Sequence, residues 1–256
     1  MILPKRFILL SVMLFGSLEL SANAPQLAED ADSAIVTTYE KAKAGDTAAQ
    51  MEMAVWYWDL HWKNAHATEK AFYWFSKAAE SNHPEANYQM GFFYQHGIGC
   101  EIDQKKALSW YENAMDLGDV MASSQLAYYY YWGVEVAVDK SKALEFCEKA
   151  LQSSDTMIRN NVAWFLATLP EDEYANGPRA LSLMQAVIAD RPADAGFYDT
   201  LAAAYAACGE QEMAITYQKV ALELCTLQLP EEENAFRERL ALYEQGKRYR
   251  QTEPFK

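Results

Sequence analysis

Apolar residues in the middle of the chain recur every three or four positions, which is the spacing of residues on one face of an α-helix. The first of these apolar faces comprises Ala86, Met90, Tyr94 and Gly97. The second comprises Ala107, Trp110, Tyr111 and Ala114. The pattern therefore predicts two consecutive helices, each burying one face and joined to the other by a short loop.

Residues that start and stop helices stand at the ends of both faces. Pro84 suits a first helical turn, where its missing N–H would have no partner in any case. Gly97 and Gly99 permit the left-handed conformations that end a helix and reverse the chain. Asp103 stands where its carboxylate can accept the free amides of a second helix. We expect Thr68 to take that capping position one unit earlier.

The helix pair repeats along the chain. Shifting the sequence by 36 residues places similar residues on one another without a change of register. The superimposed residues include Lys70, Lys106 and Lys142; Trp74, Trp110 and Phe146; Ala78, Ala114 and Ala150; and the pairs Tyr94 and Tyr130, Gly97 and Gly133, Asp103 and Asp139. A unit that recurs at this period predicts an all-α fold, an α/α superhelical solenoid of antiparallel helix pairs.

The second unit carries a specific motif. From Ala86 it reads A-x-x-x-M-G-x-x-Y-x-x-G-x-G, and from Asp103 it continues D-x-x-K-A-x-x-W-Y-x-x-A. This motif resembles the Sel-one-like repeat. The resemblance implies a superhelical fold related to tetratricopeptide repeats and a function as an interaction adaptor, in a family with many exported bacterial members.

Three such units fall within residues 47–153. The second unit matches the motif closely. The third departs from it, because Ala127 replaces the motif's glycine and residues 134–136 depart from the G-x-G loop. The first has His61 where the loop glycine belongs.

The C-terminal part resembles the tetratricopeptide family itself. Its pattern comprises Leu201, Ala202, Tyr205, Gly209, Ala214, Tyr217 and Ala221. A preceding pair, residues 161–169 and 178–189, is joined by the acidic loop 170–173. We therefore assign residues 154–228 to two tetratricopeptide-like hairpins and residues 229–256 to a capping helix and tail. Residues 25–46 form a lead-in helix or linker.

The N-terminal residues predict export. Lys5 and Arg6 precede an apolar stretch over residues 7–18, and small residues at positions 22 and 24 fit a signal-peptidase site. Residues 1–24 are thus a signal peptide, or an uncleaved membrane anchor, because Pro25 after the cut hinders the peptidase. The sequence leaves open whether the protein is periplasmic or secreted.

The composition narrows the choice of partners. The net charge is −14, and 51% of the residues are hydrophobic. An excess of acidic residues repels nucleic acid and anionic lipid. We therefore expect a protein or peptide partner, no nucleic acid, and membrane contact only through the N-terminal segment.

The four cysteines, Cys100, Cys147, Cys208 and Cys225, have irregular spacing and permit three disulfide pairings. The interpretation we favour is that each is a small buried apolar residue. Cys208 and Cys225 lie near opposite ends of one hairpin, about 20 Å apart on a helix that rises about 1.5 Å per residue. That separation exceeds what a disulfide can bridge.

Few residues indicate catalysis or metal binding. We expect structural roles for the four histidines, His61, His66, His83 and His96, whose spacing suits no metal site. The acidic runs at 171–173 and 231–233 each follow a proline, as expected of solvated helix starts. The sequence predicts no cofactor, no metal and no catalytic residue.

Aromatic residues additional to the repeat motif predict a binding surface. A column at 36-residue spacing, together with two neighbours, comprises Trp56, Phe92, Tyr128, Trp164, Tyr88 and Tyr131. In solenoids of this type the first helices line the concave side, so these residues would form an aromatic groove for an extended peptide or a helix. The alternative is that they fill the space between layers. A second column, one turn earlier, comprises Glu52, Tyr88, Ser124 and Asn160.

Three functions remain open. The first is a non-enzymatic protein-binding or peptide-binding scaffold of the bacterial cell envelope. The second, implied by the resemblance to exported relatives, is an enzyme or a binder of peptidoglycan or β-lactams. This function would require a serine with a nearby base, and neither Ser123 nor Ser124 has a lysine or histidine at helical spacing. The third is a structural spacer without a pocket.

Overall fold

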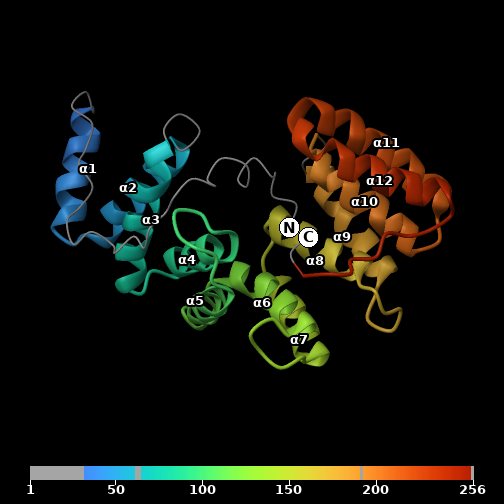
Figure 1. Ribbon diagram of the computed structural model, residues 1–256, viewed down its shortest axis with the longest axis horizontal. Coiled ribbons are helices and arrows are strands. Elements are labelled where there is room, and N and C mark those ends of the chain that lie inside the picture. Colours follow the sequence, from blue (N-terminus) through green and yellow to red (C-terminus); the bar gives the residue numbers. More distant parts are fainter. Residues whose placement is uncertain (1–31, 61–64, 191–192, 255–256) are drawn as a thin grey trace. The chain divides into compact units, whose positions relative to one another are not determined.

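The protein is described by a computed structural model over residues 32–60, 65–190 and 193–254 (Figure 1). These residues form twelve α-helices and one short 3-10 helix. The helices are α1 (Ser33–Lys43), α2 (Thr47–Asp59), α3 (Ala65–Glu80), α4 (Pro84–His96), α5 (Gln104–Asp116), α6 (Val120–Trp132), α7 (Lys140–Ala150), α8 (Thr156–Thr168), α9 (Gly177–Asp190), α10 (Ala195–Ala207), α11 (Gln211–Gln228), η2 (Pro230–Glu232) and α12 (Glu233–Glu244). The predicted all-α class is confirmed.

The described residues divide into two compact units. Residues 32–126 belong to the N-terminal unit and residues 127–254 to the C-terminal unit, with the boundary inside α6. The predicted signal peptide or anchor, residues 1–24, lies outside the described residues. Within them, no helix combines the length and the apolarity needed to cross a membrane.

Aspartate side chains begin many of the helices. Asp46 caps α2, Asp103 caps α5 and Asp139 caps α7, and each carboxylate accepts the backbone amide three residues later at 2.8–2.9 Å. The prediction for Asp103 is confirmed. The prediction for Thr68 is wrong, because α3 begins at Ala65 and Thr68 lies inside it.

Each helix packs against its neighbour in sequence. In the N-terminal unit α2 contacts α3, α3 contacts α4, and α4 contacts α5. In the C-terminal unit α8 to α11 pack in succession, and α10 also contacts α8, the first helix of the preceding pair (Figure 1). Contacts of this kind, between a helix pair and the next, are those of a repeat solenoid.

Large apolar side chains fill the space between the helices. In the N-terminal unit, Trp74 and Phe93 are almost completely buried. In the C-terminal unit, Phe236 of α12 packs with Ala195, Ala221 and other residues of α10 and α11. Helix α12 therefore covers the apolar face that α11 would otherwise expose.

Candidate functional site

The predicted aromatic column is divided between the two units. Trp56 and Phe92 lie in the N-terminal unit, and Tyr128 and Trp164 lie in the C-terminal unit. These side chains do not form the exposed groove that we expected. Phe92 is only 6% exposed, and Tyr128 and Trp164 are each 4% exposed. Trp56 alone of the four is partly exposed.

In the N-terminal unit, the predicted site residues pack against other rings. Tyr88 lies 5.6 Å from Tyr111, measured between ring centroids, and Phe92 lies 4.6 Å from the imidazole of His96. Burial lowers the pKa of His96 to about 4, so its ring is neutral at pH 7. These contacts make Tyr88 and Phe92 packing residues within their own unit. Trp56, beside Tyr57, is partly exposed.

In the C-terminal unit, two predicted site residues pack on one ring. The rings of Tyr128 and Tyr131 lie 4.9 Å and 5.4 Å from that of Phe165. Burial raises the pKa of both tyrosine hydroxyls well above the usual range. The Tyr131 hydroxyl donates a hydrogen bond to Glu171, so this residue connects α6 to the loop that follows α8.

Trp164 lies beside polar residues that the sequence did not single out. Its ring centroid lies 5.6 Å from that of Tyr249 and 5.5 Å from the guanidinium carbon of Arg239. Arg239 belongs to α12, and Tyr249 follows that helix in the C-terminal tail, which we define as residues 247–254. The surroundings of Trp164 are therefore set by residues about 75 to 85 positions later in the chain.

Arg239 takes part in a buried ion pair. Its Nε donates to Oδ1 of Asp199 at 2.7 Å, and the Gln218 amide donates to the same oxygen at 2.7 Å. Burial alone would lower the pKa of Arg239, but the Asp199 carboxylate outweighs it and raises that pKa. The pair ties α10 to α12, and the Gln218 amide adds α11 to the same contact.

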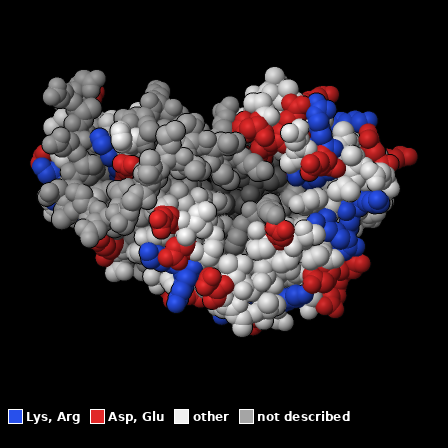
Figure 2. Space-filling model, viewed as in Figure 1, with Lys and Arg blue, Asp and Glu red and all other residues white. Residues whose placement is uncertain are grey.

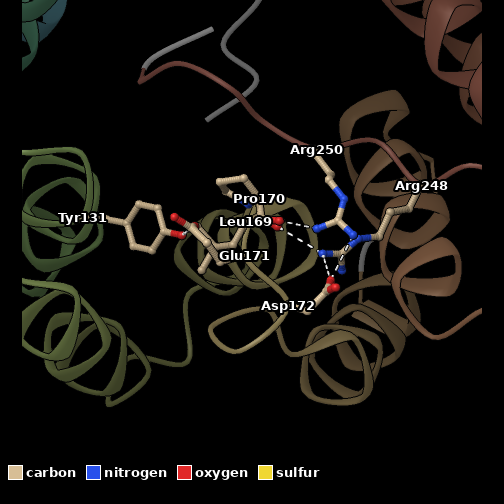
Figure 3. A network of polar contacts seen from close by, with 7 residues as sticks. All are labelled: Tyr131, Leu169, Pro170, Glu171, Asp172, Arg248 and Arg250. Carbon is tan, nitrogen blue, oxygen red and sulfur yellow. Dashed lines mark hydrogen bonds and ion pairs between the residues drawn. The ribbon is translucent and has the colours of Figure 1, made fainter.

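The loop over residues 169–176 joins α8 to α9 and carries the first acidic run (Figure 3). Glu171 accepts from Nζ of Lys140 at 2.5 Å, and this hydrogen bond, followed by that from Tyr131, lowers the pKa of Glu171. Asp172 accepts from Arg248 at 2.6 Å and from Arg250 at 3.0 Å. The expectation of a helix start is wrong here, because α9 begins only at Gly177. Both carboxylates are in ion pairs, although the Asp172 side chain is 79% exposed.

The tail also satisfies the carbonyl end of α8. The backbone amide of Gln251 donates to the Thr168 carbonyl at 2.8 Å, and Arg248 donates to the Leu169 carbonyl at 3.3 Å. Arg250 donates to the carbonyl of Pro170. The last carbonyls of a helix lack intrahelical partners and carry partial negative charge, so they attract cationic donors. Sequence reasoning missed this contact. The available signal was the basic cluster around Tyr249 in an otherwise acidic chain.

The surface is less uniformly acidic than the composition indicates. On the face drawn in Figure 2, basic side chains lie among the acidic ones over the C-terminal helices. In the C-terminal unit, Arg179 pairs with Glu148 at 2.6 Å, and Asp172 pairs with two arginines. A basic ligand would therefore meet local acidic groups on this unit, and not a uniform negative field.

All four cysteines are free thiols. Cys147 and Cys225 are buried, as expected, whereas Cys100 and Cys208 are partly exposed. Burial raises the pKa of Cys147 to about 12 and that of Cys225 to about 11. Both thiols are thus protonated at neutral pH. The described residues contain no cluster of histidine, cysteine and carboxylate side chains that could hold a metal ion.

The comparison with protein families assigns the repeats. The Sel1 repeat model matches residues 47–83, 84–119 and 120–155, and each match begins within the first turn of α2, α4 or α6. This chain is a Sel1 repeat protein. The two hairpins that we compared with tetratricopeptide repeats lie beyond the matched residues.

Solved structures share the fold. The Sel1 repeat protein resembles c5321, a protective antigen of uropathogenic Escherichia coli with an SLR fold, at 20% identity and a TM-score of 0.61. That alignment covers 83% of this chain but only 45% of c5321. A Sel1 repeat protein from Oxalobacter formigenes matches at 20% identity and a TM-score of 0.53, covering 81% of this chain and 98% of the other. No curated protein matches the sequence.

Proposed function

We propose that this Sel1 repeat protein is a non-enzymatic scaffold that binds a protein or peptide partner in the bacterial cell envelope. The observation that carries the proposal is the tail on the C-terminal unit. A non-helical segment lies against α8, and its backbone amide and arginine side chains find acceptors there. A solenoid surface that satisfies the donors of one extended segment has the chemistry required to hold another.

Further support comes from Trp56 in the N-terminal unit. This tryptophan is partly exposed on α2, and Val55 beside it is 42% exposed. Tryptophan is enriched among the residues that dominate binding energy at protein interfaces. The location outside the cytoplasm is supported by the signal-like pattern of residues 1–24, and N-terminal sequencing of the protein isolated from cell fractions would test it.

The function is tested by affinity purification from envelope extract with the full chain as bait. The variants are Trp56→Ala and, as a matched control, Leu227→Ala, which removes a side chain that is 82% exposed on α11. We expect a partner that the wild type and the control retain and that Trp56→Ala binds at least about 2 kcal/mol more weakly, when the purified partner is titrated by calorimetry.

Circular dichroism and urea unfolding would establish that the variants are folded. Equal binding by Trp56→Ala and the wild type would place the interface elsewhere on the repeats. A wild-type bait that enriches no protein over empty beads would contradict the scaffold function.

A further inference from the structure

The tail differs in composition from the rest of the chain. It follows α12 after Gly246, whose φ of 72° turns the backbone out of the helix. Lys247, Arg248 and Arg250 then surround Tyr249, whereas the whole chain has a net charge of −14. The tail is thus a short basic and aromatic segment attached to an acidic protein.

The surface under the tail is complementary to it. We define the tail face as the residues of α8, α12 and the α8–α9 loop that the tail contacts: Trp164, Thr168, Leu169, Pro170, Asp172 and Arg239. Backbone carbonyls and one carboxylate accept the tail's donors, and an indole ring receives the tyrosine. Figure 3 shows both arginines directed at Asp172 and at the carbonyls beside it.

Several details weaken the attachment of the tail, although Gln251 is buried. The Asp172 side chain is 79% exposed and that of Arg250 is 39% exposed, so water competes for their ion pair. Nε of Arg248 is buried and has no hydrogen-bond partner among the described residues, which opposes binding of the tail. Burial and the nearby Arg250 also lower the pKa of Arg248. No α-helix follows α12 in the described residues, so release of the tail would unfold none.

We propose that the tail is a resident ligand of the tail face, and that a partner's extended peptide with an aromatic residue between two arginines displaces it. This inference rests on the proposed function and specifies the class of partner for the C-terminal unit. The tail competes as a tethered segment, whose effective concentration is on the order of millimolar. A partner's peptide must therefore bind tightly enough to compete with the tethered tail. Until such a peptide displaces it, the tail keeps the indole of Trp164 covered.

The test uses a fluorescein-labelled peptide with the sequence of residues 246–253 and full-length protein. In one variant, Arg248→Ser, Tyr249→Ala and Arg250→Ser are combined, so that the attached tail no longer competes. Arg237→Ser is the matched control, because it removes an arginine of α12 whose ion pair is with Glu233 and not with the tail face. Fluorescence anisotropy measures binding of the peptide to each protein.

We expect the triple variant to bind the peptide about ten-fold more tightly than the wild type or the Arg237→Ser control. Adding Asp172→Asn to the triple variant should weaken that binding about five-fold. A peptide of the same length with the same three substitutions should not bind. The proposal is overturned if the folded triple variant binds the peptide no more tightly than the wild type does, or binds both peptides equally.

A second measurement uses the unmodified chain and does not depend on the variant folding. The amide of Gln251, which donates to Thr168, should exchange with solvent about a hundred-fold faster than the protected amides of α12, and excess unlabelled peptide should increase its rate. If the amide of Gln251 exchanges only when α12 does, at a rate that the peptide does not change, the tail is permanently bound and the proposal is wrong. Neither result depends on Trp56, so failure here is distinguishable from failure of the scaffold function.

Discussion

The loop between α4 and α5 and the loop between α8 and α9 both connect the helices of a pair, but only the second is also bound by residues far along the chain. The first, residues 97–103, closes on itself, since the amide of Asp103 donates to the carbonyl of Tyr94 at 2.9 Å. The second, residues 169–176, has a similar local bond, from the amide of Asn176 to the carbonyl of Leu166 at 2.9 Å. It is held in addition by Arg248 and Arg250, whose partners in the loop lie 76 to 80 residues earlier in the chain.

The same contrast extends to the helices around the loops. In the second repeat, the fit depends on neighbours in one helix pair, as where the ring of Tyr111 lies against Gly91. In the C-terminal unit, Asp199 is paired with Arg239, 40 residues away. The second repeat is therefore stabilised by contacts within one helix pair, and the C-terminal helices in addition by polar contacts between residues far apart in the chain.

The largest effect on stability is expected from breaking the buried ion pair between Asp199 and Arg239. Asp199→Ala would leave the guanidinium of Arg239 buried without its carboxylate, and removing one partner of a buried pair destabilises a protein by about 3–5 kcal/mol. Urea unfolding followed by circular dichroism would measure the loss. The double variant with Arg239→Met should recover most of it, because an apolar side chain requires no partner. If Asp199→Ala lowered the free energy of unfolding by less than about 1 kcal/mol, long-range polar contacts would not distinguish the C-terminal helices from the second repeat.

A smaller effect is expected from the local contact in the second repeat. A Cβ at Gly91 would lie 2.7 Å from ring carbons of Tyr111, so Gly91→Ala should destabilise the protein by about 1–3 kcal/mol. The third repeat has Ala127 and Cys147 at the equivalent positions, where a thiol smaller than a ring accompanies the methyl group. Gly91→Ala should therefore have an effect near zero in a Tyr111→Cys background, as a double-mutant cycle would show. If Gly91→Ala changed the stability equally in both backgrounds, the ring of Tyr111 would not be what excludes a methyl group at this position.

Much of the fold followed from local signals that the sequence repeats. The position of Asp103 predicts a helix cap, its repetition one period later predicts another at Asp139, and the structure has both. Thr68 was misplaced because the first unit lacks the loop glycine, with His61 in its place, so its helix start could not be inferred from the other units.

The sequence predicts less of the candidate site than of the fold, for a related reason. A spacing of 36 residues identifies the side of the helix on which Tyr128 and Trp164 lie, but it does not tell what packs against that side. Trp164 is in contact with Tyr249 and Arg239, which belong to no repeat match. Contacts between a periodic and a non-periodic segment leave no pattern in a single sequence.

The smallest predicted effect concerns the loop that departs from the motif. Glu135 in the third repeat has φ 57°, and its counterpart Gly99 has φ 69°, so the backbone keeps its shape although the glycine is lost. A non-glycine residue in this left-handed region is strained by about 1–2 kcal/mol, and the greater freedom of an unfolded glycine offsets part of any relief. Glu135→Gly should thus stabilise the protein by about 0.5–1 kcal/mol, measured as a shift of the urea midpoint at unchanged slope.

Gly99→Ala is the matched substitution in the second repeat and should act in the opposite direction. It introduces the same left-handed strain, and its Cβ would lie 3.3 Å from Cβ of Phe72, so destabilisation by about 1 kcal/mol or more is expected. If both variants were destabilised, the contacts of the Glu135 side chain would have to stabilise the protein by more than its left-handed backbone conformation destabilises it. The third repeat would then be held by a contact of its own and would belong with the C-terminal helices in this comparison.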